Sequence, residues 1–341
     1  MDCWYRIFCC FSKSSPPTNN DLPVLTAPLL RQLDPPGPIK LVAFGDWGAT
    51  AGAPLLEMIG KYIREIARPN AVVLLGDSAY NFGVSQLLGT KDPVFQLFST
   101  HLAGPRSHSV YGSTPSDIPY WVVAGNHDHL GNIEAQLRYE KIDPRWSMVR
   151  TYEVKKLRIE GDKVVCLWLF DSIRVPYFVE SMRRSIETQI RGCHWRIMGS
   201  HYPIHTEGMY KRDSTTIMMK QLIGQLLGEF DFHMYISGHE HSSQVLFNED
   251  TKTVHLIAGA SVSVRRDIGQ DDLDPTTDDE YDYVWGNDSL LPVVLQLEIT
   301  EYSIVYKFVH LHRCNATGVA LGSETTLFID SIVHRQNVIL N

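Results

Sequence analysis

Short runs of hydrophobic residues, each followed by a small polar cluster, recur along the chain from about residue 40. Five of these runs end in the segments GDWG, GDSAY, GNHD, GSHYP and GHEH. Hydrophobic runs of this length, separated by segments with helical spacing, are typical of parallel strands that are buried between layers of helices. The pattern therefore predicts an α/β fold in which five strands end in polar residues.

The spacing of the hydrophobic residues also predicts two amphipathic helices, over residues 54–67 and 215–227. Pro54 suits the first turn of the first helix. The turn around Gly161 and Asp162 predicts a β-hairpin. The predicted strands cover residues 40–44, 71–75, 120–124, 152–159, 163–170, 195–198, 232–236, 254–258, 292–300, 302–311 and 326–334.

The first 38 residues differ in composition from the rest of the chain, because residues 12–38 are rich in Ser, Pro, Asn and Asp. This composition predicts a tail and linker over residues 1–38, followed by one folded domain over residues 39–341. Within that domain, the acidic residues 270–283 (QDDLDPTTDDEYDY) predict an exposed loop. No hydrophobic stretch approaches the roughly 18 residues of a transmembrane helix.

The N-terminal segment has two open interpretations. Cys9 and Cys10 lie among aromatic residues and are followed by Lys13, which is consistent with acylation and a lipid anchor in a membrane. Alternatively, the tail is disordered and its cysteines have no role. Asp2 and the interruption of the hydrophobic stretch by Arg6 make the segment a poor match to a signal peptide. The localisation of the protein therefore stays open.

Composition and charge exclude several classes of protein. A chain of 341 residues, of which 44% are hydrophobic, can bury a large core. The formal net charge of -8 is not the basic footprint of a nucleic-acid-binding protein. Six cysteines form neither a CxxC pair nor a regular framework, so we expect no zinc knuckle and no disulfide scaffold. We expect Cys166, inside a hydrophobic run, to be a buried reduced thiol.

The polar clusters carry the candidate chemistry. Ligands of α/β proteins gather at the carboxyl ends of strands, so the five clusters are expected to converge on one site. The candidate metal ligands are Asp46, Asp77, Tyr80, Asn126, His201, His239 and His241. Oxygen and imidazole donors without a thiolate suit iron, manganese or zinc. A centre of two ions would need one shared ligand, and a carboxylate is the natural bridge.

In their order along residues 39–310, these motifs resemble those of the calcineurin-like metallophosphoesterases, and their GDWG and GDSAY forms resemble the small, tartrate-resistant type of purple acid phosphatase. The resemblance implies a four-layer α/β/β/α sandwich of two mixed β-sheets flanked by helices. It also implies a monomer that hydrolyses phosphate monoesters with water activated by two metal ions. The alternatives are a protein phosphatase, a nucleotidase, a phosphodiesterase, or a non-catalytic binding protein that retains the fold.

The resemblance also assigns the candidate ligands to two ions that share Asp77. Fe(III) would be held by Asp46, Tyr80 and His241, and a divalent ion (Fe, Zn or Mn) by Asn126, His201 and His239. Many relatives carry a metal-binding histidine two residues after the first aspartate, where this chain has Gly48. Tyr80 would replace that missing ligand with a phenolate.

The catalytic residues beside the ions are inferred in the same way. His127 would contact the phosphate and protonate the leaving alkoxide, and Asp128 would orient His127. Relatives of the tartrate-resistant type carry a second catalytic histidine nine residues after the histidine that corresponds to His201, but this chain has Tyr210 there. His205 is a candidate replacement, although an ordinary loop histidine remains an equally open interpretation.

Overall fold

The computed structural model describes residues 37–49, 52–105, 117–262, 281–287, 292–313 and 319–321, which belong to one compact unit. The strands of the first sheet are β1 (Ile39–Phe44), β2 (Ala71–Leu74), β3 (Tyr120–Val122), β4 (Trp146–Met148), β12 (Val293–Ile299), β13 (Ile304–Arg313) and β14 (Val319–Leu321). The strands of the second sheet are β5 (Tyr152–Arg158), β6 (Val164–Phe170), β7 (Trp195–Gly199), β8 (Met234–Ser237), β9 (Ser243–Asn248), β10 (Thr253–Ala258) and β11 (Tyr281–Asn287).

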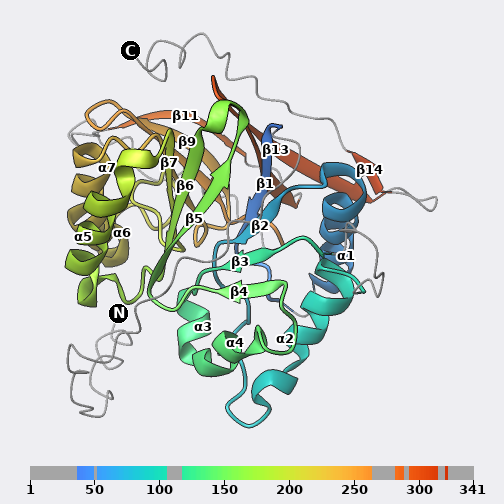
Figure 1. The fold of residues 1–341 in the computed structure, drawn as a ribbon. Helices are drawn as coiled ribbons and strands as arrows, with labels where there is room; N and C mark the ends of the chain where they lie inside the picture. The colour runs from blue at the N-terminus through green and yellow to red at the C-terminus, as the bar shows by residue number, and fades with distance from the viewer. Residues whose placement is uncertain are drawn as a thin grey trace. The chain divides into compact units, whose positions relative to one another are not determined.

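Both sheets combine parallel and antiparallel strands. The first has the order β14-β13-β12-β1-β2-β3-β4, and the second has the order β11-β9-β10-β8-β7-β6-β5 (Figure 1). In the first sheet, β1, β2, β3 and β4 are parallel neighbours, and β12 pairs antiparallel with β1. In the second, β6, β7, β8 and β10 are parallel neighbours.

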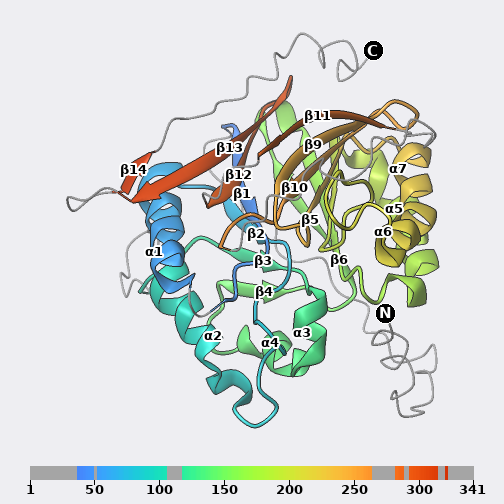
Figure 2. The ribbon, with the colours of Figure 1, turned by 180° about the vertical axis from the view of Figure 1, so that it is seen from behind.

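Helices cover the outer face of each sheet. The α-helices are α1 (Ala53–Lys61), α2 (Pro93–Gln96), α3 (Asn126–Leu130), α4 (Ile133–Tyr139), α5 (Val179–Gln189), α6 (Ser214–Met219) and α7 (Gln225–Glu229). Three of them continue into or through π-helical segments, Tyr62–Ala67, Leu97–Leu102 and Lys220–Gly224. Helices α1, α2 and α4 lie on the side of the first sheet, and α5, α6 and α7 lie on the side of the second (Figures 1 and 2).

Alternate residues of a buried strand face opposite sides of its sheet, and β1 shows what this produces. Val42 and Phe44 pack in a hydrophobic cluster with α1, whereas Leu41 and Ala43 pack in a second cluster with residues of the other sheet. A third cluster, which includes Trp168, fills the space between the second sheet and α5, α6 and α7. The four layers α/β/β/α are therefore the predicted fold, and burial of a side chain such as Phe44 contributes roughly 1.5–3 kcal/mol.

The five hydrophobic runs form strands β1, β2, β3, β7 and β8, as the sequence predicts. The predicted helices correspond to α1 with its extension and to the segment from α6 to α7. Helices α2 to α5 have no counterpart among the sequence predictions. Three of them are shorter than eight residues, and α5 buries only Met182 and Ile186, so the hydrophobic stripe that reveals a helix is too short or too thin.

Two sequence predictions are wrong. Cys166 is buried, but it forms a disulfide with Cys193, 27 residues further along the chain, instead of remaining a reduced thiol. Closing a loop of this length stabilises a fold by about 2–4 kcal/mol, because it restricts the unfolded chain. Residues 281–283 of the predicted acidic loop belong to β11, which pairs with β9.

Other predictions lie outside the described residues. They concern residues 1–36 of the predicted tail, including Cys9 and Cys10, residues 270–280 of the acidic segment, and the predicted strand over residues 326–334.

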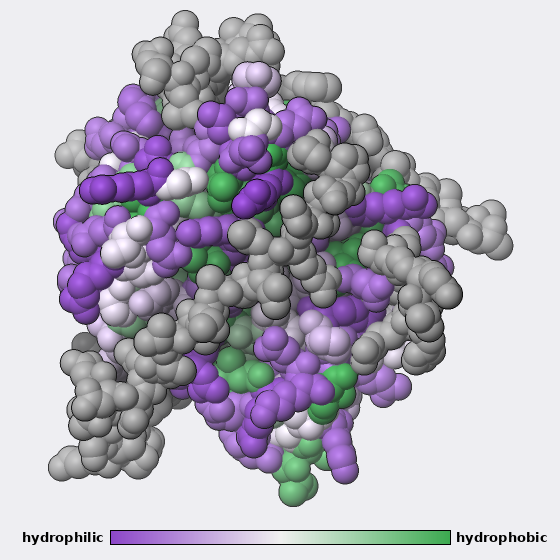
Figure 3. All heavy atoms as spheres, in the orientation of Figure 1, coloured by the Kyte–Doolittle hydropathy of each residue, from purple (hydrophilic) through white to green (hydrophobic). Residues whose placement is uncertain are grey.

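The surface of the described residues carries scattered hydrophobic side chains. Figure 3 shows hydrophobic residues on one face as separate areas among hydrophilic ones. The most exposed are Leu87, Tyr177, Tyr302 and Phe82. Singly exposed hydrophobic residues are normal on folded proteins. Among the helices of the described part of the chain, none combines the length and hydrophobicity that crossing a bilayer requires.

Candidate metal centre

The seven candidate ligands follow the carboxyl ends of five strands, six of them on loops and Asn126 as the first residue of α3. Asp46 follows β1, Asp77 and Tyr80 follow β2, Asn126 follows β3, His201 follows β7, and His239 and His241 follow β8. Because β1, β2 and β3 are parallel neighbours, and β7 and β8 are too, their carboxyl ends meet at one edge of each sheet. The fold thus brings the loops of both sheets to one place.

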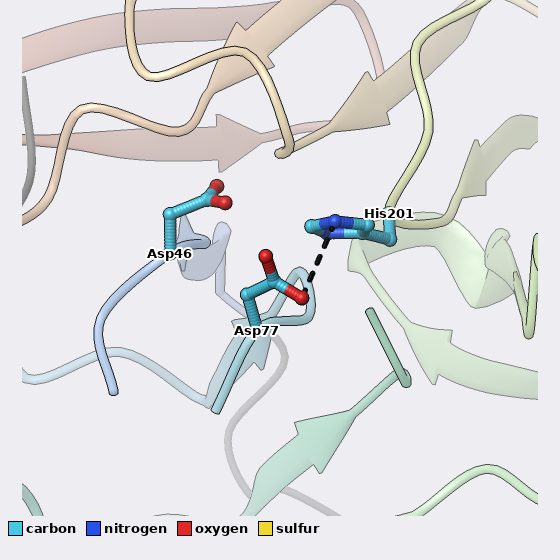
Figure 4. A group of neighbouring side chains, drawn as sticks. All are labelled: Asp46, Asp77 and His201. Atoms are coloured by element: carbon cyan, nitrogen blue, oxygen red, sulfur yellow. Dashed lines mark ion pairs between the residues drawn. The ribbon is translucent and has the colours of Figure 1, made fainter. Parts of the chain in front are cut away.

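Two carboxylates and one imidazole form the centre of this site. Ligand atoms of Asp46, Asp77 and His201 lie within 4.8 Å of one another. Figure 4 shows the two aspartates approaching from loops of the first sheet and His201 from a loop of the second. All three residues are buried, and burying carboxylates is costly unless positive charge or hydrogen bonds accompany them. The arrangement is therefore suited to a cation.

One group of contacts surrounds Asp46. Its Oδ1 accepts a hydrogen bond of 3.0 Å from the hydroxyl of Tyr80 and lies 3.3 Å from Nε2 of His241. The Tyr80 hydroxyl is also 3.1 Å from that nitrogen. Three donors of different chemistry, a carboxylate, a phenol and an imidazole, thus meet at one point.

A second group of contacts surrounds His201. Its Nε2 lies 3.0 Å from Oδ1 of Asn126 and 3.5 Å from Oδ1 of Asp77. Its Nδ1 is 2.8 Å from the carbonyl oxygen of Leu75, to which it donates, so Nε2 is directed into the site. The ring centroid of His239 lies 5.0 Å from that of His201. The structure thus brings Asn126, His201 and His239 close to one another.

Asp77 contacts both groups. Its Oδ1 faces His201, and its carboxylate also interacts with the hydroxyl of Tyr80. Gly125 makes room for this position, because a Cβ atom there would lie 2.1 Å from Oδ1 of Asp77. The carboxylate of Asp77 therefore lies between His201 and Tyr80.

The backbone at this site is held in an unfavourable conformation. Asp46, Asp77 and His239 have φ angles of 62°, 53° and 67°, in the left-handed region that residues other than glycine rarely adopt. Each such residue costs on the order of 1–3 kcal/mol, which the surrounding packing must offset. Strain of this kind at three candidate ligands indicates that the fold positions them for a purpose other than stability.

Gly48 lies directly against the loop that carries Asp77. A Cβ atom at Gly48 would lie 2.0 Å from the backbone oxygen of Ser78, so no histidine fits there without displacing the loop that carries Asp77. The Tyr80 hydroxyl lies instead against Asp46 and His241. The glycine at position 48 and the tyrosine at position 80 therefore lie on two loops that are in steric contact.

The Tyr80 hydroxyl is kept protonated by its surroundings. Burial raises the pKa of Tyr80 far above its ordinary value, and the carboxylates of Asp46 and Asp77 raise it further. Ionisation of this phenol therefore requires a nearby cation of high charge, which would reverse the effect of the carboxylates.

Asp46 and His239 have the charge state that suits a metal ion, whereas His201 differs: burial lowers its pKa, but the carboxylates of Asp77 and Asp46 outweigh this and raise the pKa above that of an ordinary histidine. Burial disfavours ionisation of Asp46, but His241 and the other nearby histidines outweigh it, so the pKa of Asp46 is below its usual value. Burial and the neighbouring His201 lower the pKa of His239 well below that of an ordinary histidine. Anionic carboxylates and a neutral imidazole are the forms that bind metals. The residues present therefore fit a metal centre.

His127 lies at the exposed side of the site. Its Nδ1 is 2.6 Å from the carbonyl oxygen of Asn81, and its Nε2 lies 3.9 Å from Oδ2 of Asp77. Its backbone N–H donates to Oδ1 of Asp77 over 3.0 Å. The side chain is 30% exposed, so one ring nitrogen is fixed by the protein while the other is directed toward the centre and accessible to a substrate.

Asp128 does not orient the ring of His127, contrary to the sequence prediction. Its buried carboxylate accepts hydrogen bonds from the backbone N–H groups of Ser78 and Gly125 and from the side-chain amide of Gln136. It thereby joins the loops that follow β2 and β3. The geometry assigns the orientation of His127 to the carbonyl of Asn81, which has no side-chain signal in the sequence.

The ionisation of Asp128 should make the stability of the metal-free protein depend on pH. Burial raises its pKa to about 6 from 3.8, and the charge of Asp77 contributes. Since the protonated form is favoured in the folded state, this contribution to stability is complete below about pH 4 and disappears as the pH rises through about 6. The shift corresponds to roughly 3 kcal/mol.

Denaturant unfolding of chelator-treated protein between pH 4 and 7 measures this effect. Asp128→Asn should be less stable at acid pH, because it loses hydrogen-bond acceptors, but its stability should fall less between pH 4 and 6 than that of the wild type. Equal slopes for the two proteins would contradict the assignment.

His205 and Tyr210, the residue at the expected position of the second catalytic histidine, lie in different surroundings. His205 is buried, with Nε2 3.2 Å from the side-chain nitrogen of Asn248 and its ring 4.8 Å from that of His255. Tyr210 stacks on His239, with ring centroids 4.1 Å apart. The structure therefore stacks Tyr210 on a candidate ligand and places His205 beside Asn248 and His255.

Glu240 is a residue of the site to which the sequence reasoning gave no role. It lies between His239 and His241 in the GHEH segment and is buried. Its carboxylate accepts hydrogen bonds from Tyr210 and Thr206. A carboxylate between two histidines was visible in the sequence, but its partners lie about 30 residues earlier, and local spacing does not reveal them.

Comparisons with known proteins confirm the resemblance. Residues 39–243 match the family model described as calcineurin-like phosphoesterase. Rat tartrate-resistant acid phosphatase type 5 is 28% identical over 259 residues, which cover 67% of this chain and 75% of that protein. Its human counterpart is 29% identical over 241 residues, covering 62% and 70% of the two chains. Purple acid phosphatase 17 of Arabidopsis thaliana is 27% identical over 264 residues, covering 70% and 73%.

Solved structures share the fold. The structure described as GAP50, the anchor in the inner membrane complex of Plasmodium, has a TM-score of 0.64 and 18% identity, covering 89% of this chain and 96% of that chain. Purple acid phosphatase PPD1 from yellow lupin seeds has a TM-score of 0.55 and 12% identity, covering 84% and 53%. At these identities the likeness concerns the fold alone.

Proposed function

The chain belongs to the calcineurin-like phosphoesterase family, and from this premise we propose that it hydrolyses phosphate monoesters at a centre of two metal ions. The observation that carries the proposal is the arrangement around Asp77. Two groups of donors, one at Asp46 and one at His201, meet at this single carboxylate. The similar acid phosphatases favour a monoester as the substrate.

The two groups of donors divide the ligands between the ions. Fe(III) would be held by Asp46, Tyr80 and His241, the divalent ion (Fe, Zn or Mn) by Asn126, His201 and His239, and Asp77 would bridge them. When bound, the two ions supply neutralisation of charge on the phosphoryl oxygens and activation of a water molecule. A trivalent ion at the first position would suit Tyr80, because a phenolate is a hard anionic donor.

The protein's own residues would supply orientation and a proton. His127 has Nδ1 fixed by Asn81, which leaves Nε2 to contact the phosphate and to donate a proton to the departing alkoxide oxygen. Asp128 keeps the loops that carry Asp77 and Asn126 together. No covalent intermediate with the protein is required.

The alternatives remain those that the sequence leaves open: a protein phosphatase, a nucleotidase, a phosphodiesterase, or a non-catalytic protein that retains the fold. The likeness to the anchor GAP50 concerns the fold and does not choose among these alternatives. Against the non-catalytic protein stands the presence of all seven candidate ligands, three of which (Asp46, Asp77 and His239) are held in a strained backbone.

Metal content, visible spectrum and activity test the proposal together. We expect about two ions per chain, a violet colour from charge transfer between phenolate and Fe(III), and hydrolysis of p-nitrophenyl phosphate but not of its bis ester. Tyr80→Phe should remove the colour.

Three results would change the conclusion. Less than one ion per chain would favour the non-catalytic protein, and preferential hydrolysis of the bis ester would favour a phosphodiesterase. A colourless, fully active enzyme with two zinc or two manganese ions would remove the iron assignment and leave the family assignment intact.

A further inference from the structure

The loop of residues 206–210 encloses the carboxylate of Glu240. The Oε2 atom of Glu240 accepts hydrogen bonds from the backbone N–H of Tyr210, over 3.2 Å, and from the hydroxyl of Thr206, over 3.3 Å. The backbone of Met209 also donates to this carboxylate. At Gly208, a Cβ atom would lie 2.1 Å from the carboxyl carbon, so the backbone of the loop passes directly against it. Only 1% of Glu240 is exposed.

A second side chain holds the same loop. The buried amide of Gln244, on β9, accepts a hydrogen bond of 2.8 Å from the backbone N–H of Glu207 through Oε1. Its nitrogen lies 3.1 Å from the hydroxyl of Thr206, to which it donates. The loop of residues 206–210 is therefore attached at two points, Glu240 and Gln244, to the segment that also carries the candidate ligands His239 and His241.

This attachment determines the position of Tyr210. The Tyr210 ring stacks on the imidazole of His239 at 4.1 Å between centroids, with 25° between the planes. Tyr202 meets the same imidazole edge to face at 4.7 Å. The backbone N–H of His239 donates to Oδ2 of Asp46 over 2.9 Å. The imidazole is thus restrained at its backbone, at its edge and across one face.

We infer that Tyr210 and Glu240 are positioning residues for His239: Glu240 holds the loop of residues 206–210, and the loop holds the Tyr210 ring against the imidazole that binds the divalent ion. An imidazole whose rotation is already restricted loses less freedom when it binds an ion, so the ion is retained longer. The inference rests on the proposed function only in requiring that His239 binds a divalent ion. The hydroxyl of Tyr210 has no part in it, because stacking uses the ring.

Retention of zinc tests the inference without any substrate. Protein loaded with Zn²⁺ at the divalent position is mixed with a chelator, and loss of zinc and of iron is followed by elemental analysis. Tyr210→Ala and Glu240→Ala should lose zinc roughly 10- to 100-fold faster than the wild type, as is usual when a group that orients a ligand is removed. Tyr210→Phe keeps the ring and Glu240→Gln keeps an acceptor, so both should stay within about 3-fold of the wild type.

Matched controls separate positioning from general destabilisation. Tyr302→Ala removes an exposed tyrosine between β12 and β13 and should not change zinc loss. Thermal unfolding of the metal-free variants shows whether they are folded, and Tyr210, which is only partly buried, carries the test if Glu240→Ala does not fold. The inference would be overturned if Tyr210→Ala lost zinc at the wild-type rate. It would also be overturned if all the variants lost zinc as slowly as the wild type does.

Failure of the inference and failure of the proposed function give different results. A wild type that retains zinc but hydrolyses no phosphate ester, with faster zinc loss in the alanine variants, would remove the proposed activity and support the positioning roles. A wild type that binds no divalent ion would overturn both.

Discussion

Replacement of Asp77 by asparagine is expected to lower kcat for phosphate-ester hydrolysis by roughly 10³-fold or more, because the charge that two ions share is worth several kcal/mol in the transition state. The side chain of Asp77 contacts both His201 of one group and Tyr80 of the other. An amide keeps the size of the side chain but loses its negative charge. We therefore also expect fewer than two ions per chain in the variant.

Steady-state kinetics with p-nitrophenyl phosphate and elemental analysis of the same preparation check this result. Asp171→Asn is a matched control, since Asp171 is another buried aspartate but pairs with His129, at 2.8 Å. The control should keep two ions. An Asp77→Asn enzyme with two ions and near-normal kcat would contradict the bridging role.

His127→Ala is expected to lower kcat by roughly 10²- to 10⁴-fold for alkyl phosphates, the usual contribution of a general acid. The effect should be much smaller for p-nitrophenyl phosphate, whose phenolate leaves without needing a proton. The reason lies in the ring geometry: Asn81 fixes Nδ1, and the accessible Nε2 faces the centre near Asp77. Comparison of the two substrates thus separates proton donation from phosphate binding.

His129→Ala is the control for His127, because both histidines lie on α3 but His129 pairs with Asp171. It should leave the ratio of the two rates unchanged. If His127→Ala slowed both substrates equally, the residue would bind phosphate without donating a proton, and the general acid would have to be sought elsewhere.

Much of the fold and of the candidate site could be predicted because it depends on local pattern. Strands such as β1 and β2 are continuous hydrophobic runs, and each is followed within a few residues by a candidate ligand, Asp46 or Asp77. Parallel strands end at the same edge of a sheet, so the convergence of these residues follows from the chain order alone. Short helices such as α3, with five residues, have too few positions to show a period.

The pairing of Gly48 with Tyr80 was visible in the sequence, but its physical reason was visible only in the structure. Both residues are visible in the sequence, and the resemblance to relatives pairs them. The reason for the pairing is steric, since a side chain at position 48 would collide with the backbone of Ser78. That contact joins loops that follow different strands, and only the packed structure contains it.

The sequence by itself determined the α/β class, the strand ends and the residue types of the proposed metal centre, because hydrophobic periodicity and chain order act locally. Only the tertiary structure showed the disulfide of Cys166, the partners of Asp128 and the stacking of Tyr210 on His239. Each of these contacts joins residues about 27 to 50 positions apart, namely Cys166 to Cys193, Asp128 to Ser78, and Tyr210 to His239. Such contacts depend on how separate loops pack, and packing against a distant partner leaves no period in the sequence.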